Sequence, residues 1–238
     1  MDKQNLSEIR KNPRRKTQEN GETVAVQKNS KLLFIGDSIT DCGRARPVGE
    51  KDGLGNGYVG QINAILSATH PDRSIRVLNT GISGNRVCDL KDRWQPDVSD
   101  LNPDWLSIMI GINDVWRQFD NPLNPRQVDL VEYEDTLKAL VERTQPRLQG
   151  LVLMTPFYLE ANPQDPMRNL MDRYGQVVKK VAEAGQAIFV DTQQAFDRYL
   201  ACQPTQSLCG DRVHPNPTGH MILAKAFLDA VGFRWPSD

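Results

Sequence analysis

Near the C-terminus, the segment Asp211-Arg-Val-His-Pro215 places a carboxylate and an imidazole within one turn. At this spacing the aspartate can orient the histidine, and the pair can accept and return a proton. A lone histidine is often a satisfied structural residue, but His214 is the only one of three histidines in this arrangement. We therefore interpret His214 as a general base, and we expect His70 and His220 to be structural.

A serine stands directly after a predicted buried strand, in the segment Phe34-Ile-Gly-Asp-Ser-Ile-Thr-Asp41. After Gly36 the chain can leave the strand at a sharp angle, which would expose Ser38 on a rigid frame, as a nucleophile requires. The alternative is an ordinary helix cap made by the Asp-Ser pair. The segment is not a Gly-x-Ser-x-Gly elbow, because Thr40 replaces the second glycine, and it is not a phosphate-binding loop.

Two further loops could present hydrogen-bond donors to a ligand. The segment Asn79-Thr-Gly-Ile-Ser-Gly-Asn85 combines two glycines with small polar residues, which can leave a backbone N–H free. The segment Gly111-Ile-Asn-Asp114 offers the neutral side-chain amide of Asn113. Either loop taken alone could be an ordinary turn.

The elements that must position these loops alternate between strands and helices. Short apolar runs rich in branched residues recur from Lys31 onward, and their length and continuity are typical of buried parallel strands. The predicted strands are Leu32–Ile35, Ile75–Leu78, Leu106–Ile110, Leu151–Met154 and Ile188–Val190. The predicted helices are Tyr58–Ala68, Tyr133–Gln145, Leu170–Ala184 and Thr218–Val231. This order predicts an α/β fold: a three-layer α/β/α sandwich around a doubly wound, five-stranded parallel sheet.

The links between these elements differ in length. Links from helix to strand are short, whereas the links from strand to helix are long: Asp41–Gly57, Gly111–Arg126 and Thr155–Pro166. Because ligands bind outside the carboxyl ends of the strands in open parallel sheets, we expect the functional site at this edge.

Composition excludes several classes of protein. The chain has 238 residues, 25% of them charged, and a net charge of −1, so it does not favour binding of nucleic acid or of an anionic membrane. No apolar run reaches the roughly 18 residues of a membrane helix, and the N-terminus is too polar for a secretory signal. The four cysteines lack Cys-x-x-Cys spacing. These features indicate a soluble, cytoplasmic protein.

Residues 1–30 differ from the rest of the chain. They hold seven basic and four acidic residues and few apolar ones, which favours a disordered extension over a basic arm for an acidic partner. We expect residues 31–238 to form a single domain, and deletion of residues 1–28 to leave its melting temperature nearly unchanged.

Taken together, four segments resemble the SGNH subgroup of the GDSL hydrolases, over essentially all of Lys31–Val231. The blocks appear in the family's order: Gly36-Asp37-Ser38, Gly84, Gly111-x-Asn113-Asp114 and Asp211-x-x-His214. Three longer stretches are similar to bacterial intracellular acetylxylan esterases: Gly36–Pro47, Ser107–Gln118, and Met154–Tyr158 with Asp165–Met167. Those esterases often carry a bulky aromatic residue directly before the catalytic aspartate. This chain has Cys209-Gly210 there, so the resemblance does not extend to the shape of the acyl pocket.

The resemblance implies a serine mechanism in which Ser38 is the nucleophile, His214 the general base and then acid, and Asp211 the orienting carboxylate. The oxyanion would be held by the backbone N–H groups of Ser38 and Gly84 and by the side-chain amide of Asn113. An acetyl ester would give an acetyl-enzyme that water hydrolyses, with no metal or other cofactor.

Several neighbouring residues have less specific roles. Asp37 and Asp114 are expected to be structural, because a carboxylate close to the oxyanion would oppose its charge. Candidates for contact with a sugar are Trp116, Arg117, Tyr158, Arg44 and Arg46, although each could equally be a packed or solvated loop residue. By resemblance we expect a homo-oligomer.

Three functions remain open from the sequence. The first is a serine esterase acting on acetylated xylo-oligosaccharides. The second keeps the same three residues but acts on aryl esters, thioesters or lipids. The third is a non-catalytic nucleotide-binding or signalling module that uses Asp37 as its acidic residue. This function would leave His214, Asp211 and Asn113 without a role.

Overall fold

The five predicted apolar runs all form parallel strands of one sheet. The computed structural model describes residues 24–121, 123 and 126–235. The strands are β1 (Lys31–Gly36), β3 (Arg76–Asn79), β4 (Trp105–Met109), β5 (Gly150–Met154) and β6 (Ile188–Val190). They lie in the order β3-β1-β4-β5-β6. The predicted α/β class and the parallel core of the sheet are confirmed.

The sheet has six strands in the described part of the chain, not the five that were predicted. The additional strand, β2 (Gly49–Glu50), runs antiparallel to β3 at the edge of the sheet. Two residues are too few to show any alternation of apolar and polar side chains, so the strand was hidden in the link Asp41–Gly57. Arg76 of β3 forms a two-pronged ion pair with Glu50, which ties the short strand to its neighbour.

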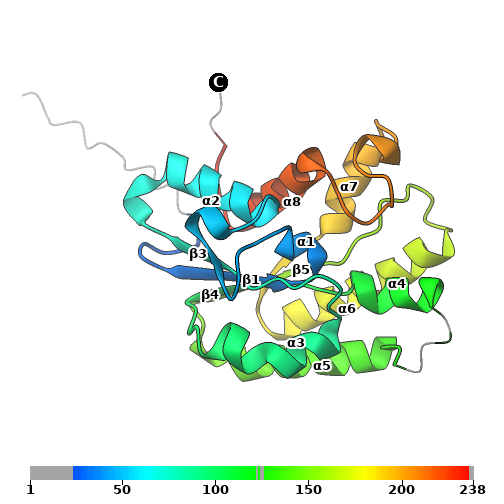
Figure 1. Ribbon diagram of the computed structural model, residues 1–238, viewed down its shortest axis with the longest axis horizontal. Coiled ribbons are helices and arrows are strands. Elements are labelled where there is room, and N and C mark those ends of the chain that lie inside the picture. The colour runs from blue at the N-terminus through cyan, green and yellow to red at the C-terminus, as the bar shows by residue number, and fades with distance from the viewer. Residues whose placement is uncertain (1–23, 122, 124–125, 236–238) are drawn as a thin grey trace, which may run out of the picture.

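Helices cover both faces of the sheet (Figure 1). On one face lie α2 (Tyr58–Thr69), α7 (Thr192–Leu200) and α8 (Pro217–Ala230). On the other lie α3 (Val87–Trp94), α5 (Leu130–Thr144) and α6 (Pro166–Ala184). Two further helices, α1 (Ser38–Asp41) and α4 (Ile112–Asp120), begin where β1 and β4 end.

The helices α1, α3, α4 and α7 were not predicted from the sequence. Each is nine residues or shorter, which gives too few turns for a helical period to stand out. One consequence concerns the long link Gly111–Arg126, because α4 occupies much of it. The site therefore borders on a helix where an irregular loop was expected.

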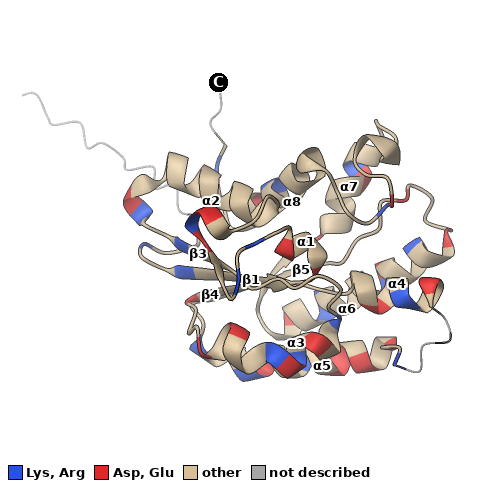
Figure 2. Ribbon diagram, viewed as in Figure 1, with Lys and Arg blue, Asp and Glu red and all other residues tan. Residues whose placement is uncertain are grey.

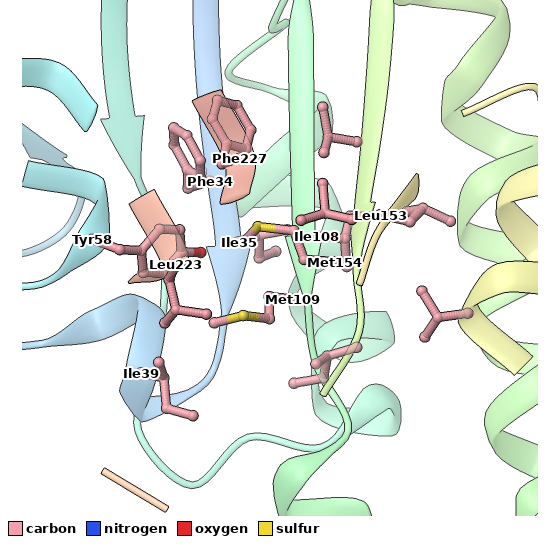
Figure 3. Close-up of a cluster of buried hydrophobic side chains, with 14 of the residues drawn as sticks. Phe34, Ile35, Ile39, Tyr58, Ile108, Met109, Leu153, Met154, Leu223 and Phe227 are labelled. Atoms are coloured by element: carbon pink, nitrogen blue, oxygen red, sulfur yellow. The ribbon is translucent and has the colours of Figure 1, made fainter. Parts of the chain in front are cut away.

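The core lies on both sides of β1, because every residue of this strand after the first is buried. Figure 3 shows Phe34 of β1 close to Tyr58 and Phe227, which belong to α2 and α8. The ring of Phe34 meets Tyr58 edge-on, with 5.7 Å between centroids, and lies 5.0 Å from Phe227. These ring contacts pack β1 against α2 and α8. The carboxyl end of β1 leads directly to Ser38.

Strand order reverses at β1, which lies between β3 and β4. In doubly wound sheets, such a reversal opens a crevice at the carboxyl ends of the strands, and ligands bind there. The three loops with predicted site residues follow β1, β3 and β4, so the topology gathers them at this crevice.

Packing begins before the predicted domain boundary at residue 31. Val24 and Val26 are buried, and the backbone N–H of Ala25 donates to the carbonyl of Val231 at 2.7 Å. The Arg73 guanidinium donates to the carbonyls of Val24 and Val26. Deletion through residue 28 would remove these contacts, so the expected tolerance of that deletion does not fit the structure. The predicted extension otherwise falls on residues 1–23, outside the described residues, and stays a prediction.

Charges of both signs are mixed along the outer helices, as Figure 2 shows for α3 and α5. This mixing agrees with the net charge of −1. Within the described residues, none of the helices combines the length and the apolar character needed to cross a lipid bilayer.

Candidate active site

Ser38 is the first residue of α1, directly after the end of β1. The carboxylate of Asp37 caps this helix by accepting the backbone N–H of Ile39 at 3.0 Å. A Cβ atom at Gly36 would lie 2.3 Å from Oγ1 of Thr40 and 2.4 Å from the carbonyl oxygen of Met109, so only glycine fits this exit. Because Asp37 makes the cap, the hydroxyl of Ser38 is left for another partner.

That partner is His214, whose Nε2 lies 2.9 Å from Oγ of Ser38. The other ring nitrogen, Nδ1, lies 2.6 Å from Oδ2 of Asp211. Since a carboxylate can only accept, Nδ1 of the neutral imidazole carries the proton and Nε2 presents its lone pair to the serine hydroxyl. The structure thus joins the three predicted residues in one hydrogen-bonded row that can draw a proton from Ser38.

The Asp211–His214 turn is held by its own backbone. Oδ1 of Asp211 accepts the backbone N–H groups of Val213 at 3.0 Å and of His214 at 2.8 Å. Burial acts to raise the pKa of Asp211, but hydrogen bonds from the imidazole and from these N–H groups outweigh it and lower the pKa. The carboxylate therefore stays charged, ready to stabilise an imidazolium.

The loops after β3 and β4 meet beside this row. Asn113 is buried, and its side-chain amide donates to the carbonyl of Asn85 at 3.0 Å. The loop after β3 is also tied to β1, because the N–H of Ile82 donates to the carbonyl of Gly36 at 3.0 Å. Hydrogen bonds among the described residues leave one amide hydrogen of Asn113 available to a ligand.

Gly84 lies in the same loop and has a φ of +81°. This left-handed conformation is costly for a residue with a Cβ atom, although there is open space around the position. Its backbone N–H has no hydrogen-bond partner within the part of the chain that the structure describes. Gly84 therefore offers a backbone donor with no partner among the described residues, and its role in binding an oxyanion stays a prediction.

Asp37 and Asp114 are both fully buried at this edge of the sheet. Burial raises the pKa of each carboxyl from 3.8 to about 7, against hydrogen bonds that lower it. Asp114 accepts the backbone N–H of Val87 at 3.0 Å and so anchors the start of α3. These contacts confirm the structural interpretation of both residues. A pKa of about 7 keeps each carboxyl partly protonated at neutral pH, which limits its repulsion of a nearby oxyanion.

Two arginines brace the site, and sequence reasoning assigned neither correctly. Arg44, a candidate for the rim, is instead buried and donates to the carbonyls of Gly81, Ala45 and Pro47. Arg93 was not singled out, and it binds the loop after β3 from α3. Nothing in the local pattern distinguishes either residue from a solvated arginine, because each also binds a carbonyl group far along the chain, that of Gly81 for Arg44 and that of Gly36 for Arg93.

Arg46, the other arginine proposed for the rim, has a half-exposed side chain that pairs with Asp41 at 2.6 Å. Hydrogen bonds from Arg46 and Ser83 lower the pKa of Asp41, although burial acts in the opposite direction. The ion pair therefore braces the turn after α1, and it leaves part of the Arg46 side chain open to solvent.

The three candidate sugar contacts lie at different distances from the reacting groups. The indole of Trp116 meets the imidazole of His214 edge-on, with 6.0 Å between centroids. The Arg117 guanidinium lies over this indole, 5.1 Å from its centroid. Tyr158 is partly buried, and its backbone N–H donates to Oε1 of Gln193 at 2.7 Å. Trp116 is thus the one that touches the row directly, and contact with a sugar stays a prediction for all three.

The remaining histidines have structural partners. Nδ1 of His220 accepts the backbone N–H of Tyr58 at 3.2 Å, and its Nε2 lies 3.5 Å from Sγ of Cys42. Burial lowers the pKa of His220 to about 4, so the ring is neutral at physiological pH. His70 bonds to Thr69 and lies against the ring of Phe233. The prediction that both histidines are structural is confirmed.

All four cysteines are free thiols. Burial raises the pKa of Cys42 and of Cys88, which disfavours the reactive thiolate near the site. Among the residues that the structure describes, no three His, Cys, Asp or Glu side chains gather closely enough to bind a metal ion. The groups of this site whose geometry suits a reaction are the serine, the imidazole and the nearby N–H donors.

Comparison with known proteins agrees with this geometry. The model of the GDSL-like lipase/acylhydrolase family matches residues 34–222. An acetylxylan esterase from Geobacillus stearothermophilus is 57% identical over 215 residues, which cover 89% of this chain and 98% of that protein.

Solved structures give the same result. A crystal structure of an acetylxylan esterase from the same organism has a TM-score of 0.88 at 56% identity, covering 89% of this chain and 98% of the other. An α/β hydrolase from the metagenome of Lake Arreo, Spain, has a TM-score of 0.87 at 49% identity, covering 89% and 99%.

Proposed function

The chain belongs to the GDSL-like lipase/acylhydrolase family, and on this premise we propose that it removes acetyl groups from acetylated xylo-oligosaccharides. It is a carboxylic ester hydrolase. The observation that carries the proposal is the hydrogen-bonded row of Ser38, His214 and Asp211, because it provides a nucleophile with its base already in place.

In the first half of the reaction, Oγ of Ser38 attacks the acetyl carbonyl carbon while Nε2 of His214 takes the hydroxyl proton. The resulting imidazolium is stabilised by the carboxylate of Asp211, which accepts its Nδ1–H. When the C–O bond to the sugar breaks, the imidazolium returns its proton to the leaving oxygen. The products are a sugar hydroxyl and an acetyl ester of Ser38.

In the second half, a water molecule attacks the acetyl-enzyme and gives its proton to His214. Collapse of this second tetrahedral species breaks the bond to Oγ of Ser38, which regains the proton from the imidazolium. Acetate leaves, and the starting row is restored. Neither half-reaction needs a metal or a redox cofactor.

Negative charge on the carbonyl oxygen develops in both halves. We assign its stabilisation to the N–H groups of Ser38 and Gly84 and to the side-chain amide of Asn113. Support comes from Gly84 in the loop after β3 and from Asn113 in the first turn of α4, since each keeps an N–H without a partner among the described residues. Donors that are held in advance stabilise the oxyanion without the cost of reorganising at the moment of reaction.

On the side of the leaving group, we assign sugar contacts to Trp116, Arg117 and Tyr158. The partly buried indole of Trp116 lies against His214, so a sugar ring that leaves from the serine would pass its face. On the acyl side, a Cβ atom at Gly210 would meet nothing within 4 Å, which leaves open space before Asp211.

We further propose that the enzyme acts in the cytoplasm as a homo-oligomer, and that neither nucleic acid nor a membrane is a partner. Four unpaired cysteines suit a reducing compartment. Exposed apolar side chains near the start of α5, such as Leu123 and Val131, favour contact between subunits. Light scattering tests the assembly, and a mass equal to one 26.8 kDa chain would contradict it.

A hydrolysis panel tests the substrate. Acetate release from acetylated xylo-oligosaccharides is compared with hydrolysis of nitrophenyl acetate, butyrate and octanoate. We expect the sugar to be deacetylated and the nitrophenyl rates to fall with chain length. A groove built for long chains would instead gain about 0.8 kcal/mol for each methylene that it buries. Rates that rise towards octanoate, with the sugar untouched, would favour a lipase or thioesterase.

Substitution of Trp116 refines the same panel. Trp116→Ala should lower kcat/KM for the acetylated xylo-oligosaccharide more than for nitrophenyl acetate, because only the sugar offers a ring to stack. Some loss with both substrates is expected, since the indole also touches His214. Equal losses would remove Trp116 from the sugar site.

A further inference from the structure

Arg93 lies on α3, outside the four sequence blocks, with only 13% of its side chain exposed. Its guanidinium makes four hydrogen bonds. They run to the carbonyl oxygens of Gly36 (3.0 Å) and Thr80 (2.7 Å), to Oδ1 of Asn85 (2.6 Å) and to Oδ2 of Asp97 (2.5 Å). Apart from Asp97, these partners are the ends of two strands and the loop that follows the second.

These contacts converge on the proposed oxyanion donor. Asn85 binds Arg93 through its side chain and accepts the amide of Asn113 through its backbone carbonyl, at 3.0 Å. Arg93, Asn85 and Asn113 thus form a chain of hydrogen bonds from α3 to the first turn of α4. Gly36, at the other side of the guanidinium, precedes Ser38 by two residues.

The geometry suits a guanidinium in particular. The carbonyl of Gly36 accepts the N–H of Ile82 and also the guanidinium of Arg93, and the carbonyl of Thr80, just past the end of β3, accepts the same guanidinium. The planar guanidinium offers five donors in fixed directions, so one side chain can hold several acceptors at set distances from each other. An ammonium or an amide at this position has fewer donors and cannot reach all four partners.

We propose that Arg93 is a positioning residue that directs the side-chain amide of Asn113 towards the oxyanion, acting through Asn85. This inference rests on the proposed function, in which Asn113 stabilises the oxyanion. Arg93 touches neither the substrate nor the reacting atoms. Its effect should therefore appear in kcat, because the oxyanion exists only in the transition state and its neighbouring intermediate.

The test is a double-mutant cycle with nitrophenyl acetate as substrate. Asn113→Ala should lower kcat about 10²-fold to 10³-fold, and Arg93→Gln about 10-fold to 100-fold, with KM nearly unchanged in both. In the Asn113→Ala background, Arg93→Gln should cost less than about 3-fold, because the group that it positions is already absent. Arg93→Lys should recover only part of the loss.

Two further variants separate positioning from folding. Asn85→Ala removes the acceptor of Arg93 in the loop but keeps the backbone carbonyl that Asn113 uses, so it should reproduce much of the loss in kcat even if Arg93→Gln fails to fold. Arg73→Gln is the matched control. Arg73 also bridges two backbone carbonyls, of Val24 and Val26, but far along the chain from the site. It should lower the melting temperature and leave kcat unchanged.

Each outcome decides between the two proposals. If Asn113→Ala leaves kcat unchanged, the oxyanion assignment fails and the role of Arg93 fails with it. If Asn113→Ala lowers kcat but Arg93→Gln and Asn85→Ala only lower the melting temperature, Arg93 is a structural brace and this inference alone is overturned. Fully additive losses in the double mutant would also overturn it.

Discussion

The two halves of the site are held in different ways. On the side of the oxyanion, Asn113 is buried and its contacts come from far along the chain. Asn85 lies 28 residues away, and Arg93 reaches back 57 residues to Gly36. On the side of the acid and base, the side chains of Asp211 and His214 are 45% and 46% exposed, and they bind each other across three residues.

This difference follows the chemistry that each half performs. Oxyanion donors stabilise charge only if they are already in position, so they benefit from a rigid frame that many elements share. An imidazole needs a set tautomer and orientation, and a single turn with its own carboxylate can supply both. We therefore expect substitutions on the oxyanion side to act through distant residues, and those on the imidazole side to act locally.

The largest expected effect removes the reacting groups themselves. Ser38→Ala and His214→Ala should each lower kcat by about 10³-fold or more, because each removes either the nucleophile or its base. The double mutant should be little worse than either single one, since the two residues act as a unit across the two halves. Steady-state hydrolysis of nitrophenyl acetate measures this.

Circular dichroism and melting temperature serve as the control, since neither side chain belongs to the core. Near-normal turnover by Ser38→Ala would remove the serine from its proposed role. If the fold-losses in kcat of the two single variants multiply in the double mutant, Ser38 and His214 act independently of each other.

A smaller effect is expected at Asp211, where the local turn can be dissected. Asp211→Asn keeps an oxygen for the N–H groups of Val213 and His214 but cannot accept the imidazole Nδ1–H, so kcat should fall about 10²-fold with the fold unchanged. Asp211→Ala also loses the backbone bonds, and its melting temperature should fall as well. Equal melting temperatures for the two variants would show that the turn does not depend on this carboxylate.

The same contrast explains what could be predicted from the sequence. The Asp-x-x-His turn and the buried strands depend on neighbouring residues, and both were found by spacing and apolar runs. The contacts of Arg93 depend on where α3 docks, and no spacing along the chain encodes that position. Val24 and Val26 were missed because they lie in a short apolar stretch between polar residues. Only the contacts of this segment with Arg73 and Val231, far along the chain, show that it is packed.

The smallest expected effect is on stability. It compares two carboxyl groups, that of Asp114 on the oxyanion side and that of Asp211 on the imidazole side. Burial raises the pKa of Asp114 to about 7, whereas hydrogen bonds from His214 and the turn outweigh burial and lower the pKa of Asp211. Because its pKa is raised, Asp114 holds a proton in the folded protein between pH 3.8 and about pH 7. In the unfolded chain the same carboxyl is ionised over this range. Asp114 therefore stabilises the fold less as pH rises through this window. Asp211 has the opposite sign, and its contribution is lost as pH falls below the ordinary value.

Thermal unfolding of Asp114→Asn and Asp211→Asn between pH 4 and pH 8 measures both signs. For Asp114→Asn, the free energy of unfolding relative to wild type should rise with pH by up to about 4 kcal/mol. The melting temperature relative to wild type should then rise by roughly 10 °C. The altered hydrogen bond to Val87 shifts the curve by a constant, so only its slope carries the test. Asp37 titrates over the same range and its charge contributes to the raised pKa of Asp114, so the difference reports the titration of Asp114 together with this coupling. For Asp211→Asn, the melting-temperature difference from wild type should be constant above pH 5 and should become smaller below pH 5. If the melting-temperature difference for Asp114→Asn does not change with pH, the pKa of this carboxyl in the folded protein is not raised above its ordinary value. Burial would then not distinguish Asp114 from Asp211.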